Sequence, residues 1–516
     1  MNGTTNGAHA LLATLVDSGV DVCFANPGTS EMHFVAGLDT VAEMRAVLGL
    51  FEGVVTGAAD GYARIAGRPA ATLLHLGPGL GNGIANLHNA RRAHVPLVNI
   101  VGDHALAHKP LDAPLESDIE TLARNVSGWI RSSTSTADVG NDTADAVAAA
   151  RTPPGQIATL ILPADVSWGD GATPAPPRPI PVPARVGDDA VTAAATALRS
   201  GEPTAFLLGG HALREPALSA ASRAGVACDA PLLAETFPTR LERGAGRPAV
   251  DRLGYLAEFA AIQLDGLAHL VVVDARAPIS FFAYPDKASE LTPEGCSVHV
   301  LAGPGDDVAD ALARLADAVS GSEPRLQAAS RPDRPTGAIT GESVADALGA
   351  VLPEGAIVAD EGQTAGLWCA PSTAGAPRHD WLTLTGGSIG FGLPLATGAA
   401  IAAPDRPVIC LEADGSAMYT FQALWTQARE DLNVTTILLN NRSYAILNLE
   451  LSRTGAGTPG PKALSMLDLH GPELDFVALA RGMGVAAERP ADSEAFTVAL
   501  ERAIAEPGPH LIEAVL

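Results

Sequence analysis

Two polar side chains stand where an α/β protein would hold a metal ion. Asp414 follows the apolar run 408–411, and Asn441 follows the apolar run 434–439, 27 residues after Asp414. We expect both runs to be strands, with an Asp-Gly turn after the first and a helix (418–429) between them. Parallel strands joined by a helix bind ligands off their carboxyl ends. A carboxylate, an amide oxygen and a nearby backbone carbonyl suit Mg²⁺. The alternative is an ordinary βαβ unit with turn residues at its strand ends.

A third candidate is Glu52, near the start of LFEGVVTGAADGYARIAG (50–67). The small residues that follow it predict a helix that packs closely against a neighbour. In one interpretation Glu52 is a helix N-terminal acid that faces solvent or the macrodipole. In the other it is a general acid–base group, which must be shielded from water and within hydrogen-bond reach of its partner.

His75 precedes the glycine-rich stretch GPGLGNG (77–83), at the end of a predicted strand, 70–76. The stretch has neither GxGxxG spacing nor GK[ST], which argues against a dinucleotide or P-loop site. We therefore expect a tight strand-to-helix turn. His75 is either structural or reaches a cleft at the end of the strand.

The elements that position these residues fall into three α/β domains, which is the number expected for 516 residues. Apolar strands alternate with helices, so we predict three doubly wound parallel sheets. The first domain is expected at 1–171. A linker with six prolines, 172–186, separates it from a central domain at 187–321. A second polar linker precedes the third domain, 337–516.

The composition of the chain argues against several classes of binding partner and site. The chain has 33 basic and 58 acidic residues, and its net charge of −25 argues against nucleic acid or an anionic membrane as a partner. Five scattered cysteines without CxxC spacing exclude a zinc cluster and do not indicate a disulfide framework. The start of the sequence has no basic signal-peptide region, and no apolar run reaches membrane-spanning length. We expect a cytoplasmic protein.

The stretch ADGSAMYTFQALWTQAREDLNVTTILLNN (413–441) resembles the diphosphate-binding motif of thiamine diphosphate (ThDP) enzymes, which begins Gly-Asp-Gly and ends Asn-Asn. The first glycine is replaced here by Ala413. The resemblance implies that Asp414 and Asn441 bind Mg²⁺ through their side chains and Ser443 through its main-chain oxygen. It also implies cofactor contacts from the residues that follow the aspartate, Gly415 and Ser416.

Resemblances elsewhere extend the expected site over other parts of the chain. The Glu52 segment is similar to the one that carries the catalytic glutamate of ThDP enzymes, which hydrogen-bonds the pyrimidine N1′. TLLHLGPGLGNGIANLHNA and NPGTSEMHF resemble segments of benzoylformate decarboxylases, where His75 and Thr29 match active-site residues. DEGQT (360–364) resembles a diphosphate-binding segment of acetolactate synthases, which implicates Gln363 and Thr364.

Two further segments agree with the family to different degrees. GGSIGFGLP (386–394) resembles the loop that props ThDP into its bent form, with Gly387 and Ile389 as cofactor contacts. Ordinary core packing is the alternative for Ile389. A second catalytic histidine of benzoylformate decarboxylases is replaced here by Ala283, and the arginine-rich pattern with which acetolactate synthases bind FAD is missing, so we do not expect FAD.

The resemblance implies decarboxylation of a small 2-oxo acid, pyruvate-like, through an enamine. Carboligation, as in an acetolactate synthase, is the favoured second step, because a decarboxylase needs a placed acid to protonate the enamine. The alternatives are a non-ligating 2-oxo acid decarboxylase, a non-catalytic ThDP-binding paralogue and, on the α/β pattern alone, a flavin or nicotinamide oxidoreductase. In this family the active site lies between subunits, so the resemblance also implies a homodimer or homotetramer.

Overall fold

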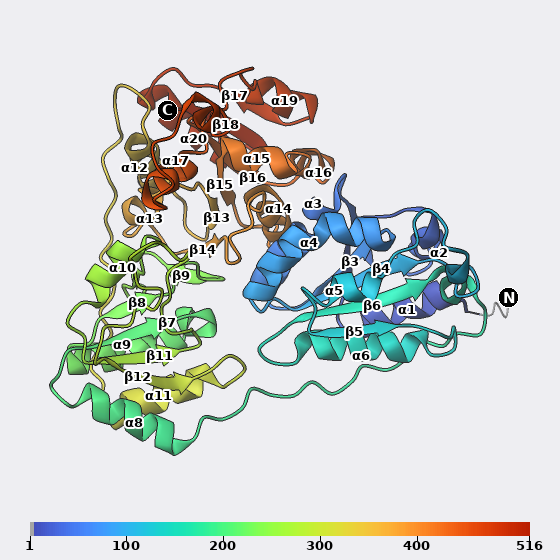
Figure 1. Ribbon diagram of the computed structural model, residues 1–516, viewed down its shortest axis with the longest axis horizontal. Helices are drawn as coiled ribbons and strands as arrows, with labels where there is room; N and C mark the ends of the chain where they lie inside the picture. The colour runs from blue at the N-terminus through green and yellow to red at the C-terminus, as the bar shows by residue number, and fades with distance from the viewer. Residues whose placement is uncertain (1–4) are drawn as a thin grey trace.

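Three helix-covered sheets organise the chain, and the computed structural model describes them over residues 5–516 (Figure 1). The predicted α/β class is confirmed. Every strand pair is parallel except one. Within the described residues, no helix combines the length and apolar character needed to cross a bilayer.

The first sheet has the order β2-β1-β3-β4-β6-β5. Its strands are β1 Val22–Asn26, β2 Arg45–Leu48, β3 Ala70–Leu74, β4 Leu97–Asp103, β5 Trp129–Ser132 and β6 Ile157–Pro163. The elements around it include α1 Gly7–Asp17, η1 Thr29–Glu31, α2 Met32–Gly37, α3 Glu52–Ala66, α4 Leu76–Arg92, α5 Ile119–Ala123, α6 Val139–Arg151 and α7 Ala164–Trp168. The extended chain 172–186 then runs from this domain to the next (Figure 1).

The central sheet has the order β10-β8-β7-β11-β12. Its strands are β7 Thr204–Leu208, β8 Leu232–Ala234, β10 Asp251–Arg252, β11 His269–Val273 and β12 Ser297–Ala302. The helices are α8 Asp188–Leu198, α9 Ala217–Cys228, α10 Ala257–Leu264 and α11 Val308–Ala318.

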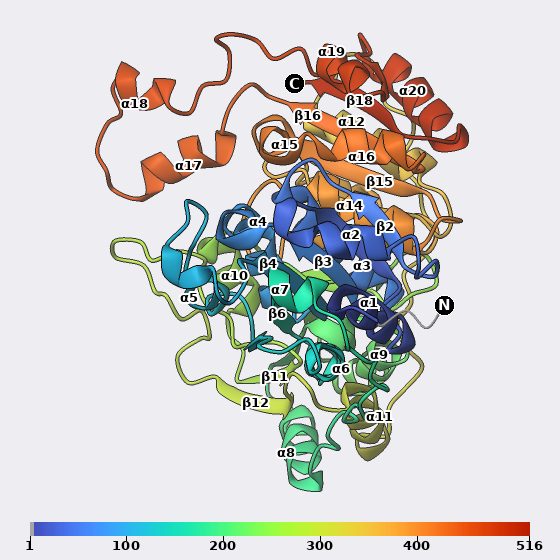
Figure 2. The ribbon, with the colours of Figure 1, turned by 90° about the vertical axis from the view of Figure 1, so that its right-hand side faces the viewer.

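The third sheet has the order β17-β18-β16-β15-β13-β14-β9. Its strands are β13 Ile357–Glu361, β14 His379–Thr383, β15 Val408–Ala413, β16 Val434–Asn440, β17 Ala486–Glu488, β18 His510–Val515 and β9 Leu241–Arg243. Strand β9 comes from the central stretch of sequence, yet it pairs antiparallel with β14. The helices are α12 Gly341–Val351, α13 Cys369–Ser372, α14 Gly392–Ala402, α15 Asp414–Thr420, α16 Ala423–Arg429, α17 Ala445–Arg453, α18 Pro461–Ser465, α19 Phe476–Gly482 and α20 Ser493–Ala505. In Figure 2, α17 and α18 project away from the rest of the molecule.

Two local predictions were wrong. The glycine-rich stretch 77–83 is not a turn, because α4 begins at Leu76 and runs through it. The single helix expected over 418–429 is two helices, α15 and α16, and α15 begins at Asp414 without a separate turn.

Helices α3 and α14 join the first and third domains. A Cβ added to Gly61 would overlap the backbone oxygen of Leu395, and one added to Gly398 would overlap that of Ala58. The two backbones therefore touch, which only glycine permits at these positions. The small residues noted after Glu52 serve this close contact.

Candidate active site

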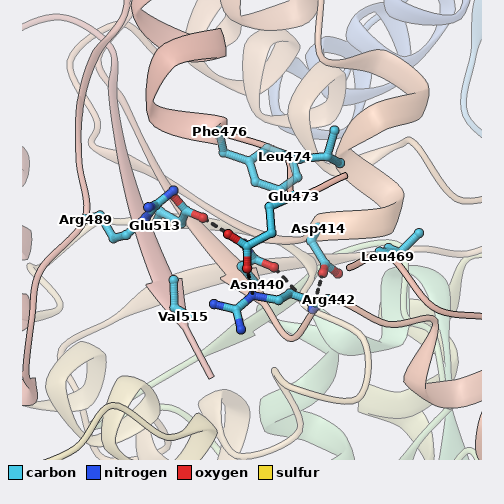
Figure 3. Close-up of a pocket in the computed structure, with 10 residues that line it drawn as sticks. All are labelled: Asp414, Asn440, Arg442, Leu469, Glu473, Leu474, Phe476, Arg489, Glu513 and Val515. Atoms are coloured by element: carbon cyan, nitrogen blue, oxygen red, sulfur yellow. Dashed lines mark hydrogen bonds and ion pairs between the residues drawn. The ribbon is translucent and has the colours of Figure 1, made fainter. Parts of the chain in front are cut away.

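The first part of the site lies at the carboxyl ends of β15 and β16. The two strands are parallel neighbours, with Ala413 paired to Leu439, so Asp414 and Asn440–Asn441 follow side by side. Oδ2 of Asp414 accepts a 2.6 Å hydrogen bond from the backbone N–H of Arg442 (Figure 3). The predicted juxtaposition of the two strand ends is therefore present.

Ala413, where the family motif has glycine, has φ −94° and ψ 148°. This is an extended conformation that any residue adopts. The replacement therefore does not disturb the path of the backbone into Asp414.

Asp414 is buried, with 2% of the residue exposed. Burial raises its pKa, against the opposing effect of hydrogen bonds from the backbone N–H groups of Gly415, Arg442 and Ser443. Oδ1 of Asn441 accepts a 3.0 Å bond from the Ser443 backbone N–H. Asp414, Asn441 and Ser443 are thus adjacent, and they can offer a carboxylate, an amide and a main-chain oxygen.

The two asparagines of the motif have different surroundings. Nδ2 of Asn440 donates to Oε1 of buried Glu513 at 2.7 Å, and Oε2 of Glu513 accepts from Nε of Arg489 at 2.8 Å. Figure 3 shows this group on the wall of a small pocket beside Asp414. Asn440 is therefore engaged structurally, which leaves Asn441 as the candidate ligand.

Gly415 and Ser416 lie in the first turn of α15 and are buried. The backbone N–H of Gly415 donates to Oδ1 of Asp414 at 2.9 Å. Gln363 and Thr364 follow β13 and are partly exposed. Gln363 has a φ of 48°, an unusual value for a residue with a side chain. Within residues 5–516 neither side chain makes a hydrogen bond, so their cofactor role stays a prediction.

Glu52 is the first residue of α3, and it is 7% exposed. Its Oε2 accepts a 3.0 Å bond from Nδ2 of Asn82 in α4. A Cβ on Gly79 would lie 3.2 Å from Oε1 of Glu52 and 3.5 Å from Cβ of His75. The structure therefore brings both Glu52 and His75 close to Gly79, and Glu52 is shielded from solvent as acid–base chemistry requires.

The loop 386–391 is held by α4. Nδ2 of Asn86 donates to the backbone oxygens of both Gly53 and Gly390, at 2.8 and 3.2 Å. Nδ2 of Asn89 donates to the Ser388 oxygen at 2.8 Å. Ile389 is partly buried against the core, and Gly387 has a φ of 74°. Asn86 and Asn89 were missed by sequence reasoning, although their spacing of three on a helix was visible.

A buried carboxyl pair supports the same loop and was also missed. Glu361 accepts from the backbone N–H groups of Gly390, Phe391 and Gly392 at 2.9, 2.7 and 2.5 Å. Oε2 of Glu412 accepts from the Leu393 N–H at 3.1 Å. Burial raises the pKa of Glu361 to about 7, and burial and the nearby Glu361 raise that of Glu412.

His75 precedes α4 as its N-cap residue and is partly exposed. Thr29 lies in η1 and is exposed. Sequence reasoning missed Glu31, two residues after Thr29, whose Oε2 lies 2.8 Å from Nδ1 of His75.

A metal at Asp414 would rely on few side chains. Within the described part of the chain, no three His, Cys, Asp or Glu side chains are grouped so that they could hold a metal ion. The proposed donor set has one carboxylate and is completed by neutral oxygens. Such a set fits Mg²⁺ that shares its coordination with a diphosphate.

Comparison with known proteins agrees with this geometry. The family description "Thiamine pyrophosphate enzyme, N-terminal TPP binding domain" matches residues 5–122, and "Thiamine pyrophosphate enzyme, C-terminal TPP binding domain" matches residues 360–514. IlvX of Mycobacterium tuberculosis, provisionally named an acetolactate synthase large subunit, is 63% identical over 99% of each chain. The benzoylformate decarboxylase of Pseudomonas aeruginosa is 32% identical over 96% of each chain. Among solved structures, the ThDP-dependent 4-hydroxybenzoylformate decarboxylase of Rhodococcus jostii RHA1 superposes with a TM-score of 0.87 at 27% identity, covering 99% of each chain.

Proposed function

The chain belongs to the thiamine pyrophosphate enzyme family, and we propose that it decarboxylates a small 2-oxo acid and joins the product to a second carbonyl compound, as an acetolactate synthase does. The observation that carries this proposal is the pairing of a buried acid, Glu52, with an intact set of oxygen donors at Asp414, Asn441 and Ser443. A paralogue without activity would have no need to keep both.

In this proposal Mg²⁺ is held by the side chains of Asp414 and Asn441 and by the main-chain oxygen of Ser443. Gly415, Ser416, Gln363 and Thr364 hold the diphosphate. When bound, ThDP supplies a nucleophilic carbon and an electron sink for the loss of CO₂. Gly387 and Ile389 would contact the bound cofactor.

The chain's own acid–base groups would move the protons. Glu52 would exchange a proton with the pyrimidine ring of bound ThDP, and its burial keeps water from competing for that proton. Asn82 fixes one oxygen of the carboxylate, so the other is free to face its partner. His75 and Thr29 contact the substrate. We further propose a homodimer or homotetramer with active sites between subunits, which light scattering of the ThDP-loaded protein would test.

A second candidate function has one specific observation in its favour. Phe281, from the loop between β11 and β12, lies 5.7 Å from Phe237, 5.2 Å from Tyr255 and 5.1 Å from Phe282, measured between ring centroids. A Cβ on Gly387 would lie 2.7 Å from Cζ of Phe281, so this aromatic group adjoins the proposed cofactor loop. An aromatic wall favours an aryl 2-oxo acid, and with it simple decarboxylation of the kind named for two of the similar proteins.

Product analysis separates the candidates. The purified protein, with ThDP and Mg²⁺, is supplied with pyruvate and, separately, with benzoylformate. Acetoin from acidified product indicates acetolactate and carboligation, and benzaldehyde indicates the aryl decarboxylase. Substrate-dependent CO₂ release from neither, while ThDP remains bound, would support the non-catalytic paralogue and overturn both candidates.

A further inference from the structure

The imidazole of His75 is backed by a buried carboxylate. Nδ1 of His75 lies 2.8 Å from Oε2 of Glu31, and this is the only side-chain partner of the ring within residues 5–516. The Glu31 side chain is fully buried, whereas that of His75 is 24% exposed. One face of the pair is therefore closed to solvent and the other is open.

The backbone on both sides makes room for this pair. A Cβ at Gly28 would overlap the His75 ring, and a Cβ at Gly102, in β4, would overlap Oε1 of Glu31. The Gly28 N–H also donates to Oε2 of Glu31 at 2.7 Å. Three separate segments of chain thus converge on the contact between the carboxylate and the imidazole.

Burying the carboxylate of Glu31 beside His75 costs folding free energy. Oε1 of Glu31 has no hydrogen-bond partner in the described structure. Burial raises the pKa of Glu31, while the Gly28 N–H and His75 act in the opposite direction. A buried carboxylate oxygen without a partner destabilises the fold, so its presence calls for a role other than packing.

We propose that Glu31 is a positioning residue that holds His75 as the Nδ1–H tautomer and leaves the lone pair of Nε2 free for the substrate. A carboxylate at one ring nitrogen fixes both the orientation of a histidine and the tautomer it adopts. The inference rests on the proposed function in one respect, which is that His75 exchanges a proton with the substrate or product.

The proton balance is simple. Neutral His75 takes up a proton from solvent at Nε2, while the proton on Nδ1 stays on the ring and remains hydrogen-bonded to Glu31. The carboxylate of Glu31 then balances the charge of the imidazolium. Nε2 then gives this proton to the product, which supplies the one proton that decarboxylation of a 2-oxo acid anion consumes, so the pair is unchanged after each turnover.

The first test measures the tautomer of His75 with Glu31 unchanged. ¹⁵N NMR of histidine-labelled, ThDP-loaded protein is expected to show His75, assigned by its loss in His75→Gln, as the Nδ1–H tautomer when neutral. The opposite tautomer would overturn the proposal. This readout does not depend on activity, so it stands even if no 2-oxo acid is a substrate and the proposed function fails.

The second test uses Glu31→Gln, which keeps the shape of the side chain but removes its charge and can donate to Nδ1. We expect kcat to fall about 10- to 100-fold, with a shift of His75 toward the Nε2–H tautomer. KM and the ThDP dissociation constant should change less than about 3-fold, because the cofactor contacts are elsewhere. The matched control is Glu43→Gln, which changes an exposed acid of the same domain.

Two results would contradict the positioning role. One is a Glu31→Gln protein with native kcat and an unchanged tautomer. The other is a variant in which kcat and ThDP affinity fall together, which indicates that Glu31 only stabilises the fold.

Discussion

The backbone N–H of Arg442 donates to the carboxylate of Asp414 across a distance of 2.6 Å. The second residue after β16 is thus tied to the first residue after β15. In the role that we propose for Asp414, its carboxylate would be oriented before a metal ion binds, because the cost of ordering it has been met during folding.

We expect Asp414→Asn to weaken ThDP binding about 10- to 100-fold or more, because the only carboxylate of the donor set loses its charge. Fluorescence titration of the metal-stripped protein with ThDP at fixed Mg²⁺ measures this. The exposed Asp405 supplies the control, since Asp405→Asn should leave the affinity unchanged. Native affinity in Asp414→Asn would remove the aspartate from the metal site.

Glu52→Gln should retain ThDP but lose turnover by a factor of about 10² to 10⁴, the usual contribution of a general acid–base group. The amide has nearly the same shape, so Asn82 can still contact it. Calorimetric titration with ThDP and a CO₂-release assay on the same sample separate binding from chemistry. A fully active Glu52→Gln would exclude the residue from catalysis.

Glu361→Ala should loosen the loop that carries Gly387 and Ile389. Three backbone N–H groups would lose their acceptor, and each hydrogen bond to a charged group contributes about 1.5–3 kcal/mol. We expect a lower melting temperature together with weaker ThDP binding. Glu361→Gln, which keeps one acceptor oxygen, should show an intermediate loss in both measurements, and equal losses in the two variants would argue against this role.

Arg64 joins all three domains. Its guanidinium is fully buried and bonds Asp60 at 2.6 Å, the Thr239 backbone oxygen at 3.1 Å and the Thr383 backbone oxygen at 2.8 Å. Arg64→Met leaves Asp60 buried without its partner, so the free energy of unfolding should fall by about 3–5 kcal/mol in urea.

The control for this prediction is Arg68→Met, four residues further along the chain and just beyond the end of α3, where the ion pair with Asp21 is exposed. Its loss should cost about 0–1 kcal/mol. Similar costs for the two variants would show that burial does not set the strength of the Arg64 contacts.

His379 should make the fold sensitive to acid. Burial, and then the charge of Arg243, lower its pKa from 6.5 to about 4, against the raising effects of the Pro377 oxygen and Asp380. The unfolded chain therefore binds a proton near pH 6.5 that the folded chain resists until about pH 4, so stability falls as the pH drops through that window.

The measurement is the free energy of unfolding of His379→Asn relative to the native protein at several pH values. Asn can still donate to Pro377, as Nδ1 does at 2.7 Å. The native protein should lose stability relative to the variant by roughly 3 kcal/mol between pH 7 and pH 4. A difference that does not vary with pH would mean that His379 is not buried neutral.

Local sequence pattern was enough to predict that the strand ends at Asp414 and Asn441 lie side by side. Two parallel strands joined by a helical segment bring their carboxyl ends together, whether that segment is one helix or two. It also placed Glu52 at the start of a closely packed helix. The family and the α/β class are confirmed, whereas the roles of the individual site residues remain predictions.

The features that could not be predicted from the sequence depend on contacts between distant segments. Neither Glu361 nor Glu31 has a local sequence pattern that indicates its role, because their partners lie 29–31 and 44 residues away. The glycines of 77–83 suggested a turn because glycine disfavours helix, yet packing against Glu52 and Thr56 overrides that weak preference. Strand β9 has three residues, too few for any periodicity to be visible.

Strand β9 also limits how the protein can be divided. It is encoded between the strands of the central sheet, but it covers the edge of β14 in the third. A fragment that begins at the second linker would leave the backbone of β14 bare, and an uncovered edge invites pairing with another chain. The last two domains are therefore expected to fold properly only when expressed together, despite the proline-containing linker between them.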